Sequence, residues 1–475
     1  MAKKTKSGKA FWRIFLAIKA GIVFILVAAL VFVNYRIDRG FYFYNAALSR
    51  QYAQYLQQGY ALDNYSLMNE RVVRTSYLNE LDSPLNTVAI GSSRILQLSQ
   101  DMVGEDVPFF NLGSSGGGLE DMLGFIYRLE LTSGLPQNLI LGIDPWLLNP
   151  DPINLHPLCD MDLYNEFLEK RLGIDTEYTP TKLGEQNTAL SYWYNLFSLS
   201  YLRRNIRFWR EHQNGVPESN IVPPEMLYRQ ETDVLLSDGS VLYSSLYRNS
   251  PREQITLDVR FHSVSFIFMR NFFELDTSRC TIFEKTVQYL KDKGVNVIFL
   301  LTPYHPLQYE YVVINNTSFS GFFMTEPWFT AVAKAYDIPL YGSFNPFVLG
   351  CEYADFYDAW HVRREALPKF FPDIASILAE QAAGKAGSSW YVTGERMTPA
   401  LAEQVLAEAY PDALAVRVED GQVEGVPAYI YSLYSGEDTE NGALLGLFAV
   451  TQNEGILYYF DTALDEWAMN TVFED

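Results

Sequence analysis

The chain has 475 residues, of which 48% are hydrophobic and 15% aromatic, which predicts two or three domains and excludes global disorder. Its 36 basic and 57 acidic residues leave a formal net charge of −21, which argues against a nucleic acid as the main partner. The three cysteines are too few for a disulfide framework and lack zinc-ligand spacing, although a Cys159–Cys280 bridge stays open. We expect no metal and no cofactor.

The N-terminal segment combines basic charge with a long apolar stretch. Residues 1–20 carry six basic residues and no acidic one, and residues 11–33 are apolar apart from Arg13 and Lys19. As a helix, residues 11–33 span about 34 Å, enough to cross a hydrocarbon core of about 30 Å. We expect residues 1–34 to be a cytoplasmic tail and transmembrane signal anchor, with the lipid bilayer as partner of residues 11–33.

The positive-inside rule keeps the basic flank in the cytoplasm, so the bulk of the chain is expected outside it, at the cell membrane. The alternative is a cleaved signal peptide, but bulky residues follow Ala28-Ala29, where a small-residue cleavage site would be needed. Residues 35–83, rich in Tyr and Gln, are expected to form a helical, membrane-proximal stalk.

Residues 84–383 alternate short apolar runs with helical segments. Each apolar run ends in a polar or Gly-rich turn, as buried strands do; the runs are residues 87–90, 107–110, 139–141 and 295–301. Helices are expected over residues 119–131, 281–293, 327–336 and 365–378. This alternation predicts an α/β domain with a parallel sheet covered on both faces, and chemistry gathers at the carboxyl ends of such strands.

Two further regions differ from this pattern. Residues 147–280 are rich in aromatic residues, Arg and Pro without a clear period, and we interpret them as an insertion that walls a site or is a mere packing excursion. Residues 391–475 hold 16 acidic residues, two arginines and no lysine. A helix over residues 399–409 and four strand-like runs predict a small acidic α+β domain with an antiparallel sheet, which loosely resembles PepSY-like extracytoplasmic modules.

The first candidate for chemistry is Gly91-Ser92-Ser93-Arg94, which follows the first apolar run. A serine at a strand-to-helix turn is presented beside free backbone N–H groups, which suits a nucleophile for acyl transfer. By itself, a Gly-Ser-Ser sequence is more often a plain turn.

The second candidate extends from Asn111 to Gly118, after the next apolar run. Its glycines let the backbone approach a ligand closely, and Gly116 is placed to donate an N–H to an oxyanion. The structural alternative is a glycine-rich turn that starts the following helix. A phosphate loop is disfavoured because no Gly-Lys-Ser/Thr follows.

The third candidate is Asp358-Ala359-Trp360-His361. A serine nucleophile needs a base, and the base needs an orienting carboxylate. Of the five histidines, His361 alone has a carboxylate at this spacing in the expected strand-end region. Taken alone, the pair is as readily a surface Asp and His.

The order of these three stretches resembles the SGNH (GDSL-like) hydrolase superfamily over residues 84–383. Gly91-Ser92-Ser93 is similar to its first block, the stretch from Asn111 to its second, and Asp358-x-x-His361 to its last. The resemblance implies a flavodoxin-like three-layer sandwich. It also implies a triad of Ser93, His361 and Asp358, and an oxyanion hole from the N–H groups of Ser93 and Gly116. Asn111, Arg94 and Trp146 are possible site neighbours.

One position departs from the family pattern. The third block usually reads G-x-N-D and its Asn donates to the oxyanion, whereas this chain has Gly142-Ile143-Asp144-Pro145. An ionised Asp144 accepts hydrogen bonds and repels an oxyanion. Three alternatives stay open: another group such as Arg94 substitutes, Asp144 is protonated, or the enzyme is weak or altered.

The Gly-Ser-Ser form and the N-terminal anchor also resemble membrane-tethered SGNH proteins of bacterial envelopes, those of teichoic-acid D-alanylation and alginate O-acetylation. We therefore expect an extracytoplasmic serine esterase or O-acyltransferase. Its expected partners are an acylated cell-surface glycan or teichoic-acid-like polymer and, for a transferase, a membrane acyl-donor protein. The alternative is a catalytically inactive SGNH-fold envelope scaffold or glycan-binding protein.

Overall fold

The chain divides into two compact units in the computed structural model. One unit comprises Met1–Ser250, Ile267–Val297 and Ile374–Leu378, and the other comprises Pro251–Phe266, Ile298–Asp373 and Ala379–Asp475. The structure describes residues 4–38, 46–63, 69–103, 107–150, 160–175, 194–264, 269, 272–314, 319–371, 377, 379, 399–423, 426–436, 442–451, 457–461 and 466–469.

A five-stranded parallel sheet confirms the mixed α/β class. Its strand order is β3-β2-β4-β8-β9, with β2 (Thr87–Ile90), β3 (Phe109–Asn111), β4 (Asn138–Ile143), β8 (Asn296–Leu301) and β9 (Leu340–Gly342). Thr87 is in register with Phe109 on one side and Asn138 on the other. Strands β2, β3 and β4 are buried along their whole length, as expected for parallel strands covered on both faces. Strand β9 was not predicted, because its residues Leu340-Tyr341-Gly342 form no apolar run.

The helices agree with the sequence predictions to different degrees. Helix α5 (Leu119–Leu131) has the predicted bounds, α11 (Thr277–Asp292) starts four residues early, and α13 (Ser320–Ala335) starts seven residues early. Further α-helices among the described residues are α2 (Ala46–Gln57), α3 (Glu70–Asn79), α4 (Gln100–Val103), α6 (Met161–Phe167), α8 (Leu199–Glu211), α9 (Ser245–Arg248), α10 (Arg252–Val264) and α12 (Pro306–Ile314).

The prediction of a helix over residues 365–378 is wrong for its first residues. A 3-10 helix covers Arg364–Lys369 and ends there. Pro368 lies within it, and a proline has no N–H to continue an α-helical ladder. Of the remaining predicted positions, residues 372–376 and 378 lie outside the described part of the chain.

The region predicted as an insertion contributes three strands to a second, small sheet. Its strands are β5 (Ile221–Val222), β6 (Val234–Leu235) and β7 (Val241–Leu242), and they form the order β5-β1-β6-β7 with β1 (Ala61–Leu62). The expected stalk segment thus supplies α2, α3 and one strand that pairs with both β5 and β6. A hydrophobic cluster of Ala61, Val222, Val234 and Leu242 holds this sheet together.

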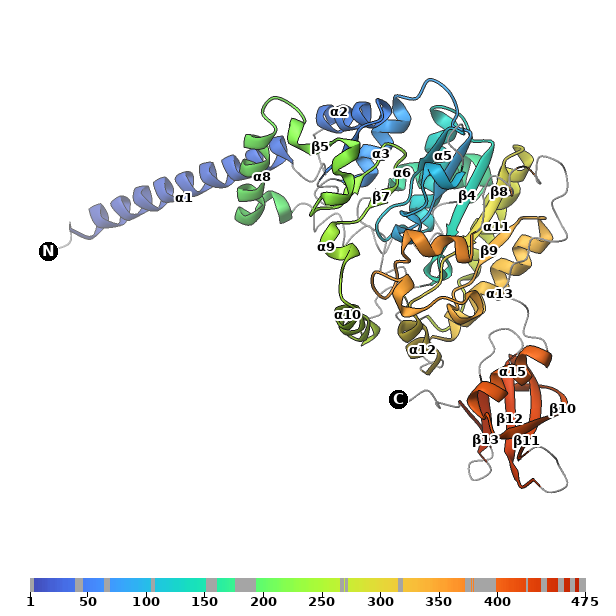
Figure 1. Cartoon of the computed structure of the whole chain (residues 1–475). Coiled ribbons are helices and arrows are strands. Elements are labelled where there is room, and N and C mark those ends of the chain that lie inside the picture. Colours follow the sequence, from blue (N-terminus) through green and yellow to red (C-terminus); the bar gives the residue numbers. More distant parts are fainter. Residues whose placement is uncertain are drawn as a thin grey trace. The chain divides into compact units, whose positions relative to one another are not determined.

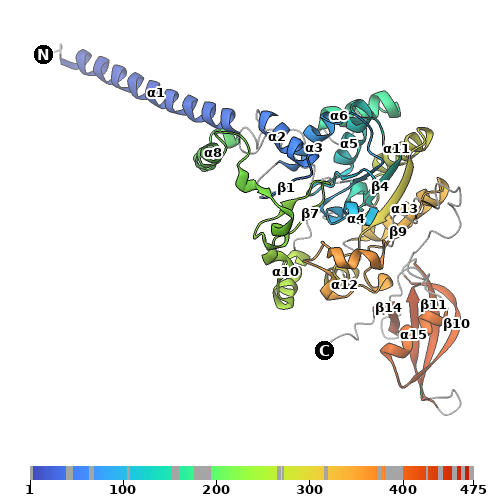
Figure 2. The same cartoon turned by 45° about the horizontal axis from the view of Figure 1, so that its top comes forward.

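The first helix, α1 (Lys4–Ile37), is long and apolar enough to cross a membrane. The candidate span covers Phe11–Ile37, 27 residues, and no residue of its 18-residue apolar stretch is buried. At 1.5 Å per residue it is about 40 Å long. Figures 1 and 2 show α1 as a single helix with α8 beside its C-terminal end.

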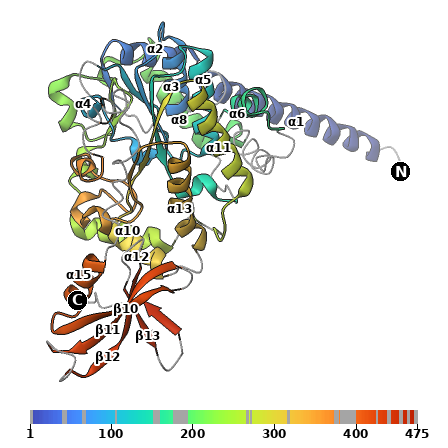
Figure 3. The same ribbon diagram turned by 90° about the vertical axis from the view of Figure 1, so that its right-hand side faces the viewer.

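The acidic C-terminal segment forms a helix and an antiparallel sheet, as the sequence predicts (Figure 3). Helix α15 (Pro399–Ala409) has the predicted bounds. The sheet runs in chain order through β10 (Ala413–Val423), β11 (Val426–Ser435), β12 (Leu444–Thr451), β13 (Leu457–Asp461) and β14 (Glu466–Met469). Ala402 and Leu406 of α15 pack on Tyr431, Phe448 and Val450 of the sheet. Strand β14 was not predicted.

Candidate active site

The two serines after β2 occupy different environments. Ser92 is buried, and its Oγ accepts a hydrogen bond from the Arg94 N–H at 3.2 Å, which caps the 3-10 turn Ser93–Ile95. Ser93 is the first residue of that turn and is half-buried. Ser92 therefore shapes the turn, and Ser93 is the serine that the turn presents at the strand end.

The glycine-rich loop after β3 is joined to the end of β2. Ser114 N–H donates to Gly91 O at 2.9 Å, and Gly117 N–H donates to Ser114 O at 2.8 Å. Gly116 adopts φ +60°, and its N–H makes no backbone hydrogen bond to any described residue. A Cβ on Gly117 would lie 2.8 Å from Gly91 O, so this close approach requires glycine. The loop thus brings the Gly116 amide to the strand end that carries Ser93.

The Asn111 side chain is buried and hydrogen-bonded within the protein, so it does not face an open site. Its side chain is fully buried and donates to Ile95 O and Leu98 O, both at 2.8 Å. Its Oδ1 accepts from Gly113 N–H at 2.8 Å. With donor and acceptor atoms all engaged, Asn111 ties the turn after β2 to the glycine-rich loop.

Arg94 and Asp144 form a buried ion pair between the ends of β2 and β4. Arg94 Nη1 lies 2.9 Å from Asp144 Oδ1, and the two side chains are 1% and 3% exposed. The Arg94 guanidinium lies 6.0 Å from the Trp146 ring, and Trp146 Nε1 donates to Gly117 O at 3.0 Å. The Arg94 guanidinium thus compensates the negative charge of the buried Asp144 carboxylate.

Helix α3 holds the glycine-rich loop from the other side, a role that the sequence did not reveal. Arg71 binds Asp121 of α5 through two nitrogens, at 2.7 and 2.8 Å, and donates to Ser115 O at 2.9 Å. Glu70 accepts the Ser115 N–H. Such bidentate, charge-assisted contacts fix geometry well. Arg71 and Glu70 are therefore positioning residues of the loop.

Arg74 of α3 links the edge strand β3 to the insertion. It is fully buried and donates to Asn111 O at 3.2 Å and to Gly239 O at 3.0 Å. Burial lowers its pKa to about 10, with Arg71 acting in the same direction and Glu70 opposing. Asn111 N–H donates to Asp238 O at 2.7 Å. The β6–β7 turn thus packs on the end of β3, next to the glycine-rich loop.

In the other unit, Asp358 and His361 form a preorganised pair. His361 Nδ1 lies 2.8 Å from Asp358 Oδ2, while Asp358 Oδ1 accepts the N–H groups of Trp360 and His361, both at 2.8 Å. Tyr357 N–H donates to His361 O at 2.9 Å, which closes the loop. The side chains are 20% and 16% exposed for His361 and Asp358. The carboxylate is therefore held in one orientation towards the imidazole.

A second histidine of this unit, His305, lies after β8. It is fully buried, its N–H donates to Ala359 O at 3.1 Å, and its Nδ1 accepts from Leu307 N–H at 3.2 Å. Burial lowers the pKa of His305 to about 4, with Arg252 acting in the same direction and Asp358 opposing. His305 is thus a neutral residue that supports the loop of Asp358.

Two of the three cysteines, Cys280 and Cys351, lie among the described residues. Cys280 and Cys351 carry free thiols, so Cys280 does not form the bridge left open with Cys159, which lies outside the described residues. Burial raises the pKa of Cys280 to about 11 and that of Cys351 to about 12, so neither is a ready nucleophile. Within the described ranges, no cluster of His, Cys, Asp and Glu could hold a metal ion.

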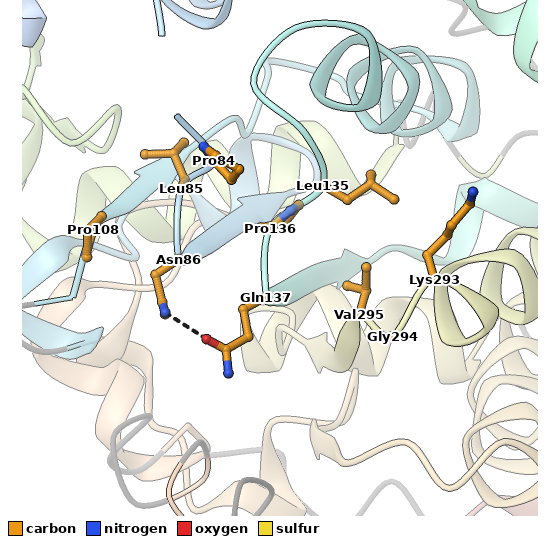
Figure 4. Close-up of a pocket in the computed structure, with 10 residues that line it drawn as sticks. All are labelled: Pro84, Leu85, Asn86, Pro108, Leu135, Pro136, Gln137, Lys293, Gly294 and Val295. Atoms are coloured by element: carbon orange, nitrogen blue, oxygen red, sulfur yellow. Dashed lines mark hydrogen bonds between the residues drawn. The ribbon is translucent and has the colours of Figure 1, made fainter. Parts of the chain in front are cut away.

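A hollow of about 520 Å³ lies at the amino-terminal ends of the strands (Figure 4). Asn86, Pro108 and Gln137 line it, just before β2, β3 and β4. In Figure 4, Asn86 and Gln137 point toward each other, joined by a 3.0 Å hydrogen bond. Because the length of the strands separates this hollow from Ser93, it is not part of the candidate site.

No protein-family model matches the chain, and no curated protein matches it. The function is therefore inferred from the geometry of the residues themselves.

Proposed function

We propose that the protein is a membrane-anchored, extracytoplasmic serine esterase or O-acyltransferase with an SGNH-like fold. Its substrate would be an acyl group on a cell-envelope polymer, an acylated glycan or a teichoic-acid-like chain. Ser93 is the nucleophile, His361 the general base and acid, and Asp358 the residue that orients the imidazole.

The observation that supports this most is the 2.8 Å contact between His361 Nδ1 and Asp358 Oδ2. A carboxylate held on Nδ1 leaves the lone pair on Nε2, where a base for a serine hydroxyl needs it. Two backbone N–H groups already occupy the other carboxylate oxygen. An Asp–His contact formed by chance at the surface would not require two backbone N–H groups to orient the carboxylate.

The position of Ser93 in the sheet also favours the proposal. Counted along the chain, the strand order is 2-1-3-4-5, the order of flavodoxin-like sheets, which bind ligands at the switch point between strands 1 and 3. Those strands are β2 and β4, followed by Ser93 and Asp144 respectively. A nucleophile at this point is accessible from the crevice outside the strand ends.

The reaction would proceed in two steps. Ser93 Oγ attacks the acyl carbonyl while His361 takes the hydroxyl proton, and the N–H groups of Ser93 and Gly116 stabilise the oxyanion. The intermediate collapses to an acyl-serine, and the leaving alcohol receives the proton from His361. A water or an acceptor hydroxyl then loses its proton to His361 and attacks the acyl group, and His361 returns this proton to Ser93 Oγ as the bond from Ser93 to the acyl group breaks.

The Arg94–Asp144 pair bears on whether catalysis is retained. An uncompensated Asp144 would repel the oxyanion, but a guanidinium 2.9 Å away offsets that charge. The non-catalytic alternative, an envelope scaffold or glycan-binding protein, rests on the same departure at Asp144. The enzyme and the non-catalytic protein differ in whether Ser93 reacts with an acyl group.

The test is acyl release from a small ester and from an acylated glycan. We expect Ser93→Ala to abolish turnover while the circular dichroism spectrum and melting temperature stay unchanged. Ser278→Ala, at an exposed serine of α11, is the matched control and should retain full activity. Undiminished turnover by Ser93→Ala would refute the role of Ser93. Transfer to a glycan hydroxyl in preference to water would identify a transferase.

A further inference from the structure

Helix α8 presents three different faces. Tyr201 and Asn205 are buried, while Leu199 and Trp209 are 66% and 53% exposed. With 3.6 residues per turn, Leu199, Leu202, Ile206 and Trp209 form one apolar stripe beside the buried face. The segment before α8 adds two more exposed aromatic rings, Tyr194 at 72% and Phe197 at 56%.

The third face of α8 is basic. Arg203, Arg204, Arg207 and Arg210 are exposed and follow the apolar stripe around the helix. Arg207 pairs with Glu211 at 3.0 Å, whereas Arg203 and Arg210 have no ion-pair partner among the described residues. This concentration of positive charge stands out in a chain whose net charge is −21. An exposed apolar stripe flanked by arginines is typical of helices that lie in a membrane interface.

Hydrogen bonds fasten α8 to the end of the apolar span. Asn34 of α1 is fully buried, and its Nδ2 lies 3.2, 2.9 and 3.2 Å from the carbonyl oxygens of Asn195, Leu196 and Ser198. Asn205 Nδ2 donates to Asn34 Oδ1 at 3.1 Å. A buried amide satisfied in this way fixes the position of α8 on α1.

A second contact acts at the same level of α1. Tyr201 OH donates to Asp38 Oδ1 at 3.0 Å, and both residues are buried. Asn34 follows directly on the apolar residues 11–33, and Asp38 comes four residues after Asn34. If those residues fill the hydrocarbon core of about 30 Å, Asn34 and Asp38 lie at the depth of the headgroups. The attached helix α8 then lies at that depth too.

We infer that α8 is an interfacial helix, which rests on the proposed membrane anchoring. Leu199, Trp209 and Phe197 insert between the acyl chains of the leaflet at the C-terminal end of α1, and Arg203, Arg207 and Arg210 bind lipid phosphates. The partner of this surface is an anionic lipid bilayer. The first unit is thereby held against the membrane by a second contact besides α1.

The test uses the full chain in lipid nanodiscs, with Cys159, Cys280 and Cys351 replaced by Ser or Ala. A polarity-sensitive fluorophore is attached at Leu199→Cys, and its quenching by nitroxide-labelled lipids is measured. Leu131→Cys, at the exposed end of α5, is the matched control, because Leu131 is 50% exposed and α2 and α3 lie between α5 and α8 in Figures 1 and 2. Ile25→Cys in α1 reports the anchor itself.

We expect a blue-shifted, strongly quenched fluorophore at positions 25 and 199 and an unquenched one at position 131. Changing Arg203 and Arg210 to Gln should reduce quenching at position 199 several-fold in anionic lipid. Quenching at position 25 but not at 199 would overturn the interfacial helix and leave the anchor intact. Quenching at neither position would overturn both. A shift at position 199 only on adding an anionic polymer or a protein would also overturn the lipid assignment.

Discussion

Arg94 and Asp144 form a buried ion pair, with Nη1 2.9 Å from Oδ1, at the switch point of the parallel sheet. The two residues follow β2 and β4, and no local sequence pattern joins them. Their contact explains how the chain tolerates an acidic residue at this buried position. It also makes the pair a structural feature that can be tested separately from catalysis.

Removing one partner of this pair should be costly. Arg94→Met leaves the Asp144 carboxylate buried without compensation, and we expect a loss of about 3–5 kcal/mol in the free energy of unfolding. The double variant Arg94→Met/Asp144→Leu has neither charge, so its free energy of unfolding should fall by much less. Denaturant unfolding of the full chain in detergent micelles measures the double-mutant cycle. Additive losses would mean that the two side chains are not coupled.

The close approach at Gly117 should make this glycine irreplaceable. A Cβ there would lie 2.8 Å from Gly91 O, so Gly117→Ala must push the loop from the end of β2, at a cost of about 1–3 kcal/mol and with loss of activity. Gly124 of α5 is the control, because its Cβ would lie 3.7 Å from the nearest atom. Gly124→Ala should stabilise the helix by about 0.5–1 kcal/mol. Similar melting temperatures for both variants would contradict the packing at Gly117.

Asp358→Asn should separate orientation from folding. The Asn Oδ1 can still accept the two backbone N–H groups, but its NH2 group would face His361 Nδ1 and force the proton onto Nε2. The imidazole then has no lone pair for Ser93, and kcat should fall by a factor on the order of 10³–10⁴. Steady-state kinetics and thermal unfolding, measured together, check this. A variant with normal kcat would exclude Asp358 from the mechanism.

His305 should make stability depend on pH. Its pKa in the folded chain is about 4, below the ordinary value of 6.5, so the folded state binds fewer protons than the unfolded state between these values. Its contribution is fully present above pH 6.5 and is lost as the pH falls towards 4. Between pH 6.5 and 5 the loss is about 2 kcal/mol.

The check on His305 is the slope of stability against pH. In His305→Asn, where the Asn Oδ1 can replace Nδ1 as acceptor for the Leu307 N–H, the decline between pH 6.5 and 5 should be smaller by that amount. Denaturant midpoints at both pH values measure it. An unchanged slope would assign the acid sensitivity to other groups.

The parts of the fold that depend on local patterns were predictable from the sequence. Helix α5 follows Gly118 and is rich in apolar residues, and β2 is a short run, Thr-Val-Ala-Ile, that Gly91 follows directly. The 3-10 helix at Arg364–Lys369 was mistaken for the start of a longer α-helix because the apolar spacing outweighed Pro368. The pairing of β1 with β5 and β6 joins residues about 160 to 170 positions apart, which no window of sequence reveals.

Some residues of the candidate site could likewise be predicted from local sequence, and others could not. Ser93, Gly116 and Asp358-x-x-His361 could be named from the sequence because turn chemistry and short spacing mark them. Arg71 and Glu70 could not, since their partners at Asp121 and Ser115 lie about 45–50 residues further along the chain. The attachment of α8 to α1 could not be predicted either, since Asn205 and its partner Asn34 lie 171 residues apart.

The most direct test of the central claim is covalent labelling with a fluorophosphonate probe, followed by mass spectrometry of the modified peptide. The full-length protein is predicted to carry the probe on Ser93, and labelling should disappear in Ser93→Ala and fall sharply in His361→Ala. An unlabelled wild-type protein, or a probe found on another serine, would contradict the proposed enzyme and favour the non-catalytic envelope protein.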